Sequence, residues 1–178
     1  MIQSEEGGNG VVMAQARVPV SDISQAFVGV LARFHTLGLS AGEFTSLWTR
    51  HLRGDCDEKT PPDMGHCDPI RADEHGELVD LLLAHRADDS QETQWLAFTI
   101  ATACLGNNHL WQDMGLSGRD VLSALMRRHF APLYEKNAHN MKWKRFFYKE
   151  LCRTAEVSLC KAPSCRVCTD YAACFGPE

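Results

Sequence analysis

The stretch from Asp73 to Gly106, DEHGELVDLLLAHRADDSQETQWLAFTIATACLG, decides the fold class of this chain. It predicts one helix from Asp73 to about Arg86 and a second from Ser90 to Leu105, which Gly106 stops. The buried face of the first helix is built from Leu78, Val79, Leu81, Leu82 and Leu83. No convincing alternation with a period of two appears here or elsewhere, so strands are not expected.

The same reasoning predicts four further helices. They run from Ser21 to about Thr36, from Ser40 to about Leu52, from Ser117 to about Phe130, and from Asn140 to about Ala155. Ser40 and Glu43 form a capping box, and Ser117 is the N-cap residue of its helix. Gly38 ends the first of these helices, and Pro132 follows the end of the third.

The segments between and before these helices have a different composition. Residues 54–71 hold three prolines and five acidic residues, which is typical of a loop, and residues 1–20 are expected to be a flexible segment. A length of 178 residues suggests one domain. We therefore predict an all-α fold, a single domain of about six helices over residues 21–178, with a C-terminal cysteine-rich cluster-binding loop.

Four cysteines crowd the C-terminal end of the chain. Cys160, Cys165, Cys168 and Cys174 are spaced C-x4-C-x2-C-x5-C and make up half of the 8 cysteines. Thiolates are soft ligands that suit iron–sulfur clusters and zinc. The first three match the C-x4-C-x2-C element of plant-type ferredoxins, whereas paired zinc ligands favour two C-x2-C units. The spacing favours an iron–sulfur type of cluster, with structural zinc and redox or disulfide chemistry as the alternatives.

The bulk composition bears on the role of this motif. At 44% hydrophobic residues, the chain can bury a core without a metal, so the motif is predicted to be functional and not a folding staple. There is no apolar run of 18 residues and no basic, apolar N-terminal signal, so we expect a cytoplasmic protein without a membrane span. Cytosolic thiols stay reduced and can hold metal.

Charge is distributed unevenly along the chain. Residues 1–100 carry 7 Lys and Arg against 16 Asp and Glu, whereas residues 101–178 carry 11 against 7. Arg145, Lys149 and Arg153 are spaced to share one side of the last helix, which leads into the cysteines. Such cations are either ordinary solvated surface or offset the charge of a cluster, an oxyanion or an acidic partner. No nucleic-acid motif accompanies them, so nucleic acid is not an expected partner.

The remaining cysteines and two histidines give weaker signals. Cys56, His66 and Cys67 are candidates for a second metal site, although their spacing favours an exposed variable loop instead. Cys104 and Cys152 fall inside predicted helices, where a lone cysteine is usually a small buried hydrophobe. His109 and His129 are expected to be surface or packed histidines and not metal ligands.

Several segments together resemble the NifQ family. They are Asn108–Leu116 (NHLWQDMGL), Arg128–Leu133 (RHFAPL), Lys136–Asn137, Met141–Lys149 (MKWKRFFYK) and the cysteine tail. The resemblance is strongest over residues 106–178 and looser over 21–105. The loop at 54–71 is not part of it.

The resemblance implies a carrier and not an enzyme. Proteins of this family are thought to hold a molybdenum–iron–sulfur cluster, with molybdate as the metal source, and to donate molybdenum for the nitrogenase iron–molybdenum cofactor. The implied ligands are Cys160, Cys165, Cys168 and Cys174, and the implied partners are the nitrogenase cofactor scaffold complex and the nitrogenase reductase protein. An electron-transfer iron–sulfur protein and a zinc-stabilised interaction domain are the alternatives.

Overall fold

Helices make up the part of the chain that the structure, a computed structural model, describes, which is residues 21–53 and 72–154. In chain order they are α1 (Asp22–Phe34), α2 (Ala41–Leu47), the π-helix η1 (Trp48–Leu52), α3 (Ala72–Ala84), α4 (Gln91–Cys104), α5 (Leu110–Asp113), α6 (Arg119–His129), α7 (Ala131–Lys136) and α8 (Trp143–Thr154). No strand occurs in these two ranges. The predicted all-α, single-domain fold is therefore confirmed for the described residues, with more helices than expected.

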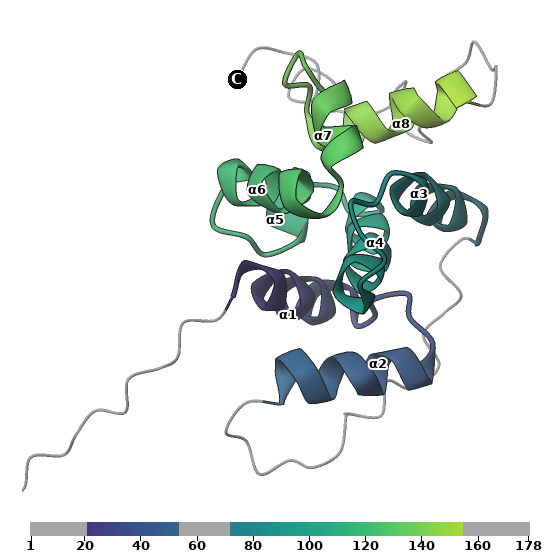
Figure 1. Cartoon of the computed structure of the whole chain (residues 1–178). Helices are drawn as coiled ribbons and strands as arrows, with labels where there is room; N and C mark the ends of the chain where they lie inside the picture. The colour runs from purple at the N-terminus through teal and green to yellow at the C-terminus, as the bar shows by residue number, and fades with distance from the viewer. Residues whose placement is uncertain (1–20, 54–71, 155–178) are drawn as a thin grey trace, which may run out of the picture.

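Helix α4 is the centre of the fold (Figure 1). Ten of its 14 residues are buried, among them Trp95, Leu96 and Ile100. Helices α1 and α3 pack against it, and α2 and α8 lie at opposite ends of the molecule. Because α4 is covered on several sides, it is buried almost all round, as a central helix should be.

Serine caps fix where three of the helices begin. The Ser21 side chain accepts a hydrogen bond from Ser24 N–H at the start of α1, and Ser90 does the same for Thr93 N–H at the start of α4. At α2 the predicted capping box is present, with Ser40 and Glu43 satisfying each other's backbone N–H groups. The first backbone N–H groups of a helix have no acceptor within the helix, and these side chains supply one.

The predicted end of α1 and the predicted start of α6 differ from the structure. Helix α1 ends at His35, which takes the left-handed conformation itself (φ 57°), before Gly38 is reached. Gly118, and not the predicted Ser117, is the N-cap residue of α6. Gly118 has an extended backbone, and the helix begins at the next residue.

Two short helices were missed. Pro132 follows the end of α6, as predicted, and it also lies in the first turn of α7, where its missing N–H is not needed. Helix α5 has only 4 residues, too few to show a period.

The last helix begins later than predicted, at Trp143 instead of Asn140. Asn140 has a positive φ of 50° and belongs to the preceding turn. The Asn137 side chain holds this turn, because its Oδ1 accepts from Met141 N–H (2.8 Å) and its Nδ2 donates to Met141 O (2.8 Å). Arg119 also donates to the carbonyl of Asn140 (2.7 Å). This loop fixes where α8 starts.

Helices α1 and α5 approach each other through two glycines. A Cβ on Gly29 would overlap the Met114 carbonyl, and Gly115 (φ 66°) lies directly opposite. Gln25 Nε2 then donates to Gly115 O (3.2 Å) across the same contact. The absence of two side chains lets the α5 turn rest on α1 backbone to backbone.

Three histidines reach α4 or its neighbours from different elements, and each contacts a hydroxyl. His51 Nδ1 of η1 lies 3.1 Å from Ser24 Oγ, His75 Nε2 of α3 lies 3.2 Å from Thr102 Oγ1, and His129 Nδ1 of α6 lies 2.7 Å from Thr93 Oγ1. Burial is the largest cause that lowers the pKa of all three imidazoles. The folded protein therefore favours their neutral forms.

None of the helices in residues 21–53 and 72–154 combines the length and the apolar character needed to cross a membrane.

Acid should destabilise the protein through these histidines. Their contribution to stability is complete above the ordinary histidine pKa of about 6.5 and is lost as the pH falls towards the lowered folded values, since the unfolded chain then binds more protons. Each additional proton that the unfolded chain binds makes the free energy of unfolding change by up to about 1.4 kcal/mol per pH unit. Urea denaturation between pH 8 and 5 measures it. His75→Gln should flatten the slope, whereas the exposed His139→Gln should not, and equal slopes in both would contradict the assignment.

Candidate functional site

The predicted metal ligands lie outside the described residues. This holds for Cys160, Cys165, Cys168 and Cys174 and also for Cys56, His66 and Cys67. Helix α8 ends at Thr154, six residues before the first cysteine of the tetrad. That the tetrad shares a metal remains a prediction. The structure describes α8, the helix that precedes the tetrad in the sequence.

The described residues contain no group of three or more His, Cys, Asp or Glu side chains that could hold a metal ion. Cys104 is buried, and burial raises the pKa of its thiol to about 12. A thiol with this pKa stays protonated at neutral pH and is a poor ligand. The prediction that Cys104 is a small buried hydrophobe is confirmed, while Cys152 on α8 is half-buried.

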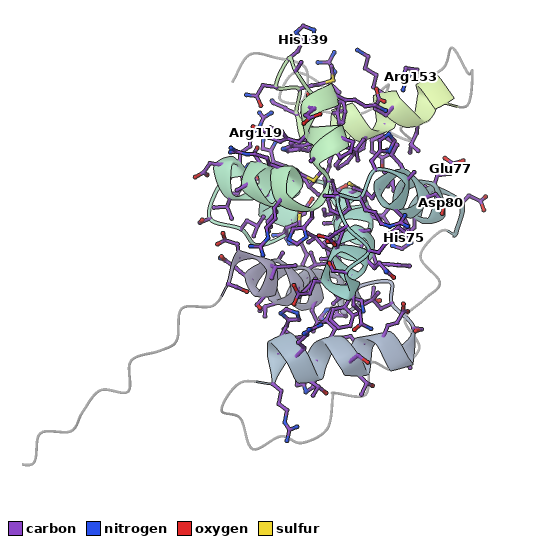
Figure 2. All side chains as sticks on the ribbon, viewed as in Figure 1. His75, Glu77, Asp80, Arg119, His139 and Arg153 are labelled. Atoms are coloured by element: carbon purple, nitrogen blue, oxygen red, sulfur yellow. The ribbon has the colours of Figure 1, made fainter. Side chains whose placement is uncertain are left out.

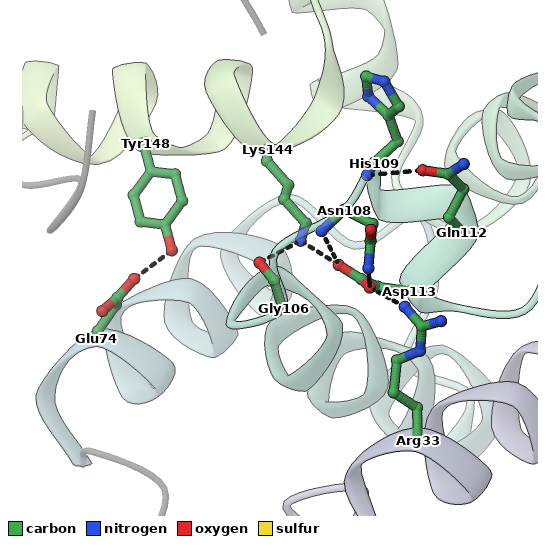
Figure 3. A network of polar contacts seen from close by, with 9 residues as sticks. All are labelled: Arg33, Glu74, Gly106, Asn108, His109, Gln112, Asp113, Lys144 and Tyr148. Atoms are coloured by element: carbon green, nitrogen blue, oxygen red, sulfur yellow. Dashed lines mark hydrogen bonds and ion pairs between the residues drawn. The ribbon is translucent and has the colours of Figure 1, made fainter. Parts of the chain in front are cut away.

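The best-defined polar cluster surrounds Asp113 at the end of α5 (Figure 3). Its side chain is fully buried, yet both oxygens are satisfied. Oδ1 accepts from Arg33 Nη1 and from Asn108 Nδ2 (2.9 Å), and Oδ2 accepts from Asn108 N–H (3.0 Å) and Lys144 Nζ (2.6 Å). Four donors on two oxygens match the capacity of an ionised carboxylate. We call Arg33, Asn108, Asp113 and Lys144 the Asp113 cluster.

The negative charge at the centre of this cluster is compensated by Arg33 and Lys144. Burial alone would raise the pKa of Asp113, but the bonds and charge of Lys144 and the bonds from Asn108 outweigh it, so the pKa is lowered. The buried carboxylate is therefore ionised and paired. Such a pair is costly to desolvate but also costly to break on one side only.

Lys144 connects this cluster to the last helix. Its Nζ also donates to Gly106 O (2.9 Å), so one ammonium group bridges the turn after α4 and the end of α5. A Cβ on Gly106 would overlap the Asp113 carboxylate, which explains why glycine occupies the turn. The first turn of α8 is thereby tied to α1, α4 and α5 together.

A second polar contact holds α8 one turn further on. Tyr148 Oη donates to Glu74 of α3 (Figure 3). Between the two contacts the helix buries Trp143, Phe146 and Phe147, whose rings lie 5.7–5.9 Å apart. The helix that precedes the cysteines is thus fixed by charge, by a tyrosine and by aromatic packing.

The predicted basic row is only partly a row of exposed cations. Lys149 and Arg153 are exposed and Arg145 is half-buried. Arg153 Nη2 donates to Glu150 (3.1 Å). Lys144, which the row did not include, is the α8 cation with a defined buried role.

Sequence reasoning missed the Asp113 cluster, although a signal was available. Asp113 follows Leu110 and Trp111 in a short apolar segment, and a carboxylate there needs partners if it is buried. Its partners lie 80 and 31 residues away in Arg33 and Lys144. Only the packing of the helices brings them together.

Neither of the two singled-out histidines takes part in this cluster as a ligand. His129 is packed inside the protein, as expected. His109 is half-buried at the start of α5, where its backbone N–H donates to Gln112 Oε1 (3.1 Å).

These features define a class: a small helical protein in which a buried ion cluster fixes α8, the last helix of the described residues, and four closely spaced cysteines follow that helix in the sequence. The chain belongs to the NifQ family, whose model, described as NifQ, matches residues 20–176. The family name ties the chain to nitrogen fixation.

Curated relatives agree with this assignment. The chain is 46% identical over 109 residues to Protein NifQ of Azotobacter vinelandii, a match that covers 61% of this chain and 56% of the relative. It is 37% identical over 143 residues to Protein NifQ of Rhodobacter capsulatus, covering 80% and 77%. A Protein NifQ homolog of Sinorhizobium fredii is 46% identical over 100 residues, covering 56% and 43%. No solved structure matches the chain.

Breaking the Asp113 cluster on one side should be strongly destabilising. Asp113→Asn leaves the buried ammonium of Lys144 without its counter-ion, and we expect a loss of about 3 kcal/mol in the free energy of unfolding. Arg33→Gln should cost less, about 1 kcal/mol or below, because 45% of the Arg33 side chain is exposed to water. Urea denaturation measures both.

A double-mutant cycle supplies the control. Lys144→Met combined with Asp113→Asn should cost clearly less than the sum of the two single changes, since the uncompensated charge is gone. Strict additivity would show that the two side chains are not coupled.

Proposed function

We propose that this protein is a carrier, and not an enzyme, that holds a molybdenum–iron–sulfur cluster as cargo at Cys160, Cys165, Cys168 and Cys174. It works in the cytoplasm and supplies molybdenum to the nitrogenase cofactor scaffold complex, with the nitrogenase reductase protein as a further partner. The observation that carries the proposal is the cysteine tetrad in a chain of the NifQ family.

The donor set suits this cargo. Four thiolates are soft ligands that bind iron well, whereas a molybdenum corner accepts sulfur together with harder oxygen or nitrogen donors. Four cysteines and a cluster of four metals leave little protein ligation for molybdenum. Weak ligation is useful in a donor, because the metal has to leave.

The helical body supports the proposal in two ways. The Asp113 cluster and the Tyr148–Glu74 bond hold α8, so the cysteine segment starts from a fixed helix. The thiol of Cys104 is buried in the helical core, and its raised pKa keeps it protonated, so it does not compete with the tetrad for metal.

Loss of single cysteines should separate metal binding from folding. We expect Cys165→Ala and Cys168→Ala to lose most bound iron, while the circular dichroism of the helices stays that of the parent chain. The buried core lies in residues 21–154 and needs no ligand from the tetrad. Cys104→Ala is the matched control and should retain its iron. Full iron retention in both tetrad variants would contradict the assignment of the tetrad as the metal site.

Molybdenum should move from this chain to the scaffold. Anaerobic, metal-loaded protein is incubated with the scaffold complex, reductant and the reductase protein, and molybdenum is assayed in each component after separation. We expect molybdenum on the scaffold and a donor that is still folded. If elemental analysis finds iron without molybdenum, the electron-transfer alternative replaces the carrier, and zinc alone would indicate an interaction domain.

A further inference from the structure

Side chains from three parts of the fold converge on the ammonium group of one lysine. Lys136 is the last residue of α7, and its Nζ lies 2.8 Å from Nε2 of His85, the residue that follows α3. The same Nζ lies 3.7 Å from Glu150 Oε2 of α8. We call His85, Lys136 and Glu150 the Lys136 cluster. It shares no residue with the Asp113 cluster, and the proposed function gives it no role.

The hydrogen-bond partners of His85 fix its protonation state. His85 Nδ1 lies 2.9 Å from the carbonyl oxygen of Leu81, and a carbonyl oxygen only accepts, so Nδ1 carries the proton. An ammonium group only donates, so Nε2 offers its lone pair to Lys136. His85 is therefore held as a neutral imidazole whose Nε2 lone pair is directed at a positive charge.

This is the form in which histidine binds metal ions. A ligating imidazole is neutral, and its other ring N–H usually donates to a backbone carbonyl or a carboxylate, which fixes the orientation of the ring. The Leu81 carbonyl supplies that second contact here. The His85 ring is thus already oriented to coordinate a cation on the side where Lys136 Nζ lies.

Glu150 adds an oxygen donor to the same place. Only 12% of its side chain is exposed, and its Oε2 also accepts from Arg153 Nη2 (3.1 Å). The Arg153 side chain is 64% exposed, so water screens its charge. A nitrogen lone pair and a carboxylate therefore converge on a point that already holds a positive charge.

An ordinary ion pair explains this arrangement less well. A charge-assisted bond between an ammonium group and a carboxylate is typically about 2.7–2.9 Å long. Here the carboxylate of Glu150 stands 3.7 Å away, and the neutral His85 imidazole is the nearer partner of Lys136. Because 40% of the Lys136 side chain is exposed, the lysine can move into water at little cost.

We propose that His85 and Glu150 form a binding site for a divalent transition-metal ion, and that the Lys136 ammonium occupies this site until the metal displaces it. An imidazole nitrogen and a carboxylate oxygen suit zinc and its neighbours in the first transition row, with water completing the coordination. Metal–ligand bonds of about 2.1 Å are shorter than the present contacts with Nζ, so the two side chains close around the metal when the lysine leaves.

The proposed site differs in kind from the cysteine tetrad. Two protein ligands and bound water make an open site from which a metal exchanges, unlike a closed structural zinc site with four protein ligands. The proposal does not rest on the molybdenum cargo, and it can hold or fail independently of the tetrad.

Removal of the internal cation is the sharpest test. Zn²⁺ binding is measured by isothermal titration calorimetry in a full-length chain in which the six cysteines outside the described residues are changed to Ala, so that their thiolates do not compete. In this background Lys136→Met should tighten Zn²⁺ binding about tenfold, because a positive charge no longer competes with the metal. Lys149→Met removes the same charge from an exposed position of α8 and should change the affinity by less than about twofold.

Histidine variants identify the ligand. Adding His85→Gln to Lys136→Met should abolish the gain in affinity, whereas adding His139→Gln should leave it intact. His139 is an exposed residue on the turn after α7 (Figure 2). In nuclear magnetic resonance spectra of the Lys136→Met chain, Zn²⁺ should shift the His85 Nε2 signal and not that of His139.

Each outcome decides the proposal. A gain in affinity that needs both the loss of Lys136 and the presence of His85 supports it. Equal affinities for Lys136→Met and Lys149→Met, no Zn²⁺ binding by Lys136→Met, or a gain that survives His85→Gln would each overturn it. If the Lys136→Met chain does not fold, as judged by circular dichroism, Lys136→Gln keeps a polar side chain there and gives the same comparison.

Discussion

The described structure depends on one buried carboxylate. Asp113 holds Arg33 of α1, Asn108 of the preceding loop and Lys144 of α8, so elements far apart in the sequence meet at two oxygen atoms. An ion pair of this kind adds little net stability compared with an apolar contact, but removing one member leaves a buried charge without its partner. We infer that it specifies where α8 lies more than how tightly the protein folds.

A fixed α8 matters because the helix has two different sides. Its inner side is held by Trp143, Phe146 and Phe147 and by the Tyr148–Glu74 bond. Its outer side carries the exposed cations Lys149 and Arg153. Anchoring the inner side fixes the helix that connects the described core to the segment that is proposed to hold the cargo.

Much of this architecture was predictable because the signals are local. The predicted helix start at Ser21 and the predicted capping box of Ser40 and Glu43 depend on residues three apart in the chain, and both are confirmed. The predicted cap Ser117 is wrong, because Gly118 holds that position. The helical class follows from apolar spacing in single segments. Helix α7 was not predicted because its signal is ambiguous: a proline such as Pro132 can follow one helix or begin the next. The metal ligation of the tetrad stays a prediction, since those cysteines lie outside the described residues.

The sequence by itself determined the helical class, the helix starts at Ser21, Ser40 and Ser90, the excess of cations near the C-terminus and the cysteine spacing, because each depends on neighbours along the chain. Only the tertiary structure decided that Asp113 meets Arg33 and Lys144, and that His51, His75 and His129 are buried against hydroxyls. It also decided which cations of α8 are buried and which face solvent. The physical reason is that burial and pairing are properties of packed helices: a residue's charge is written in the sequence, but its counter-ion and its access to water are set by which helices come together.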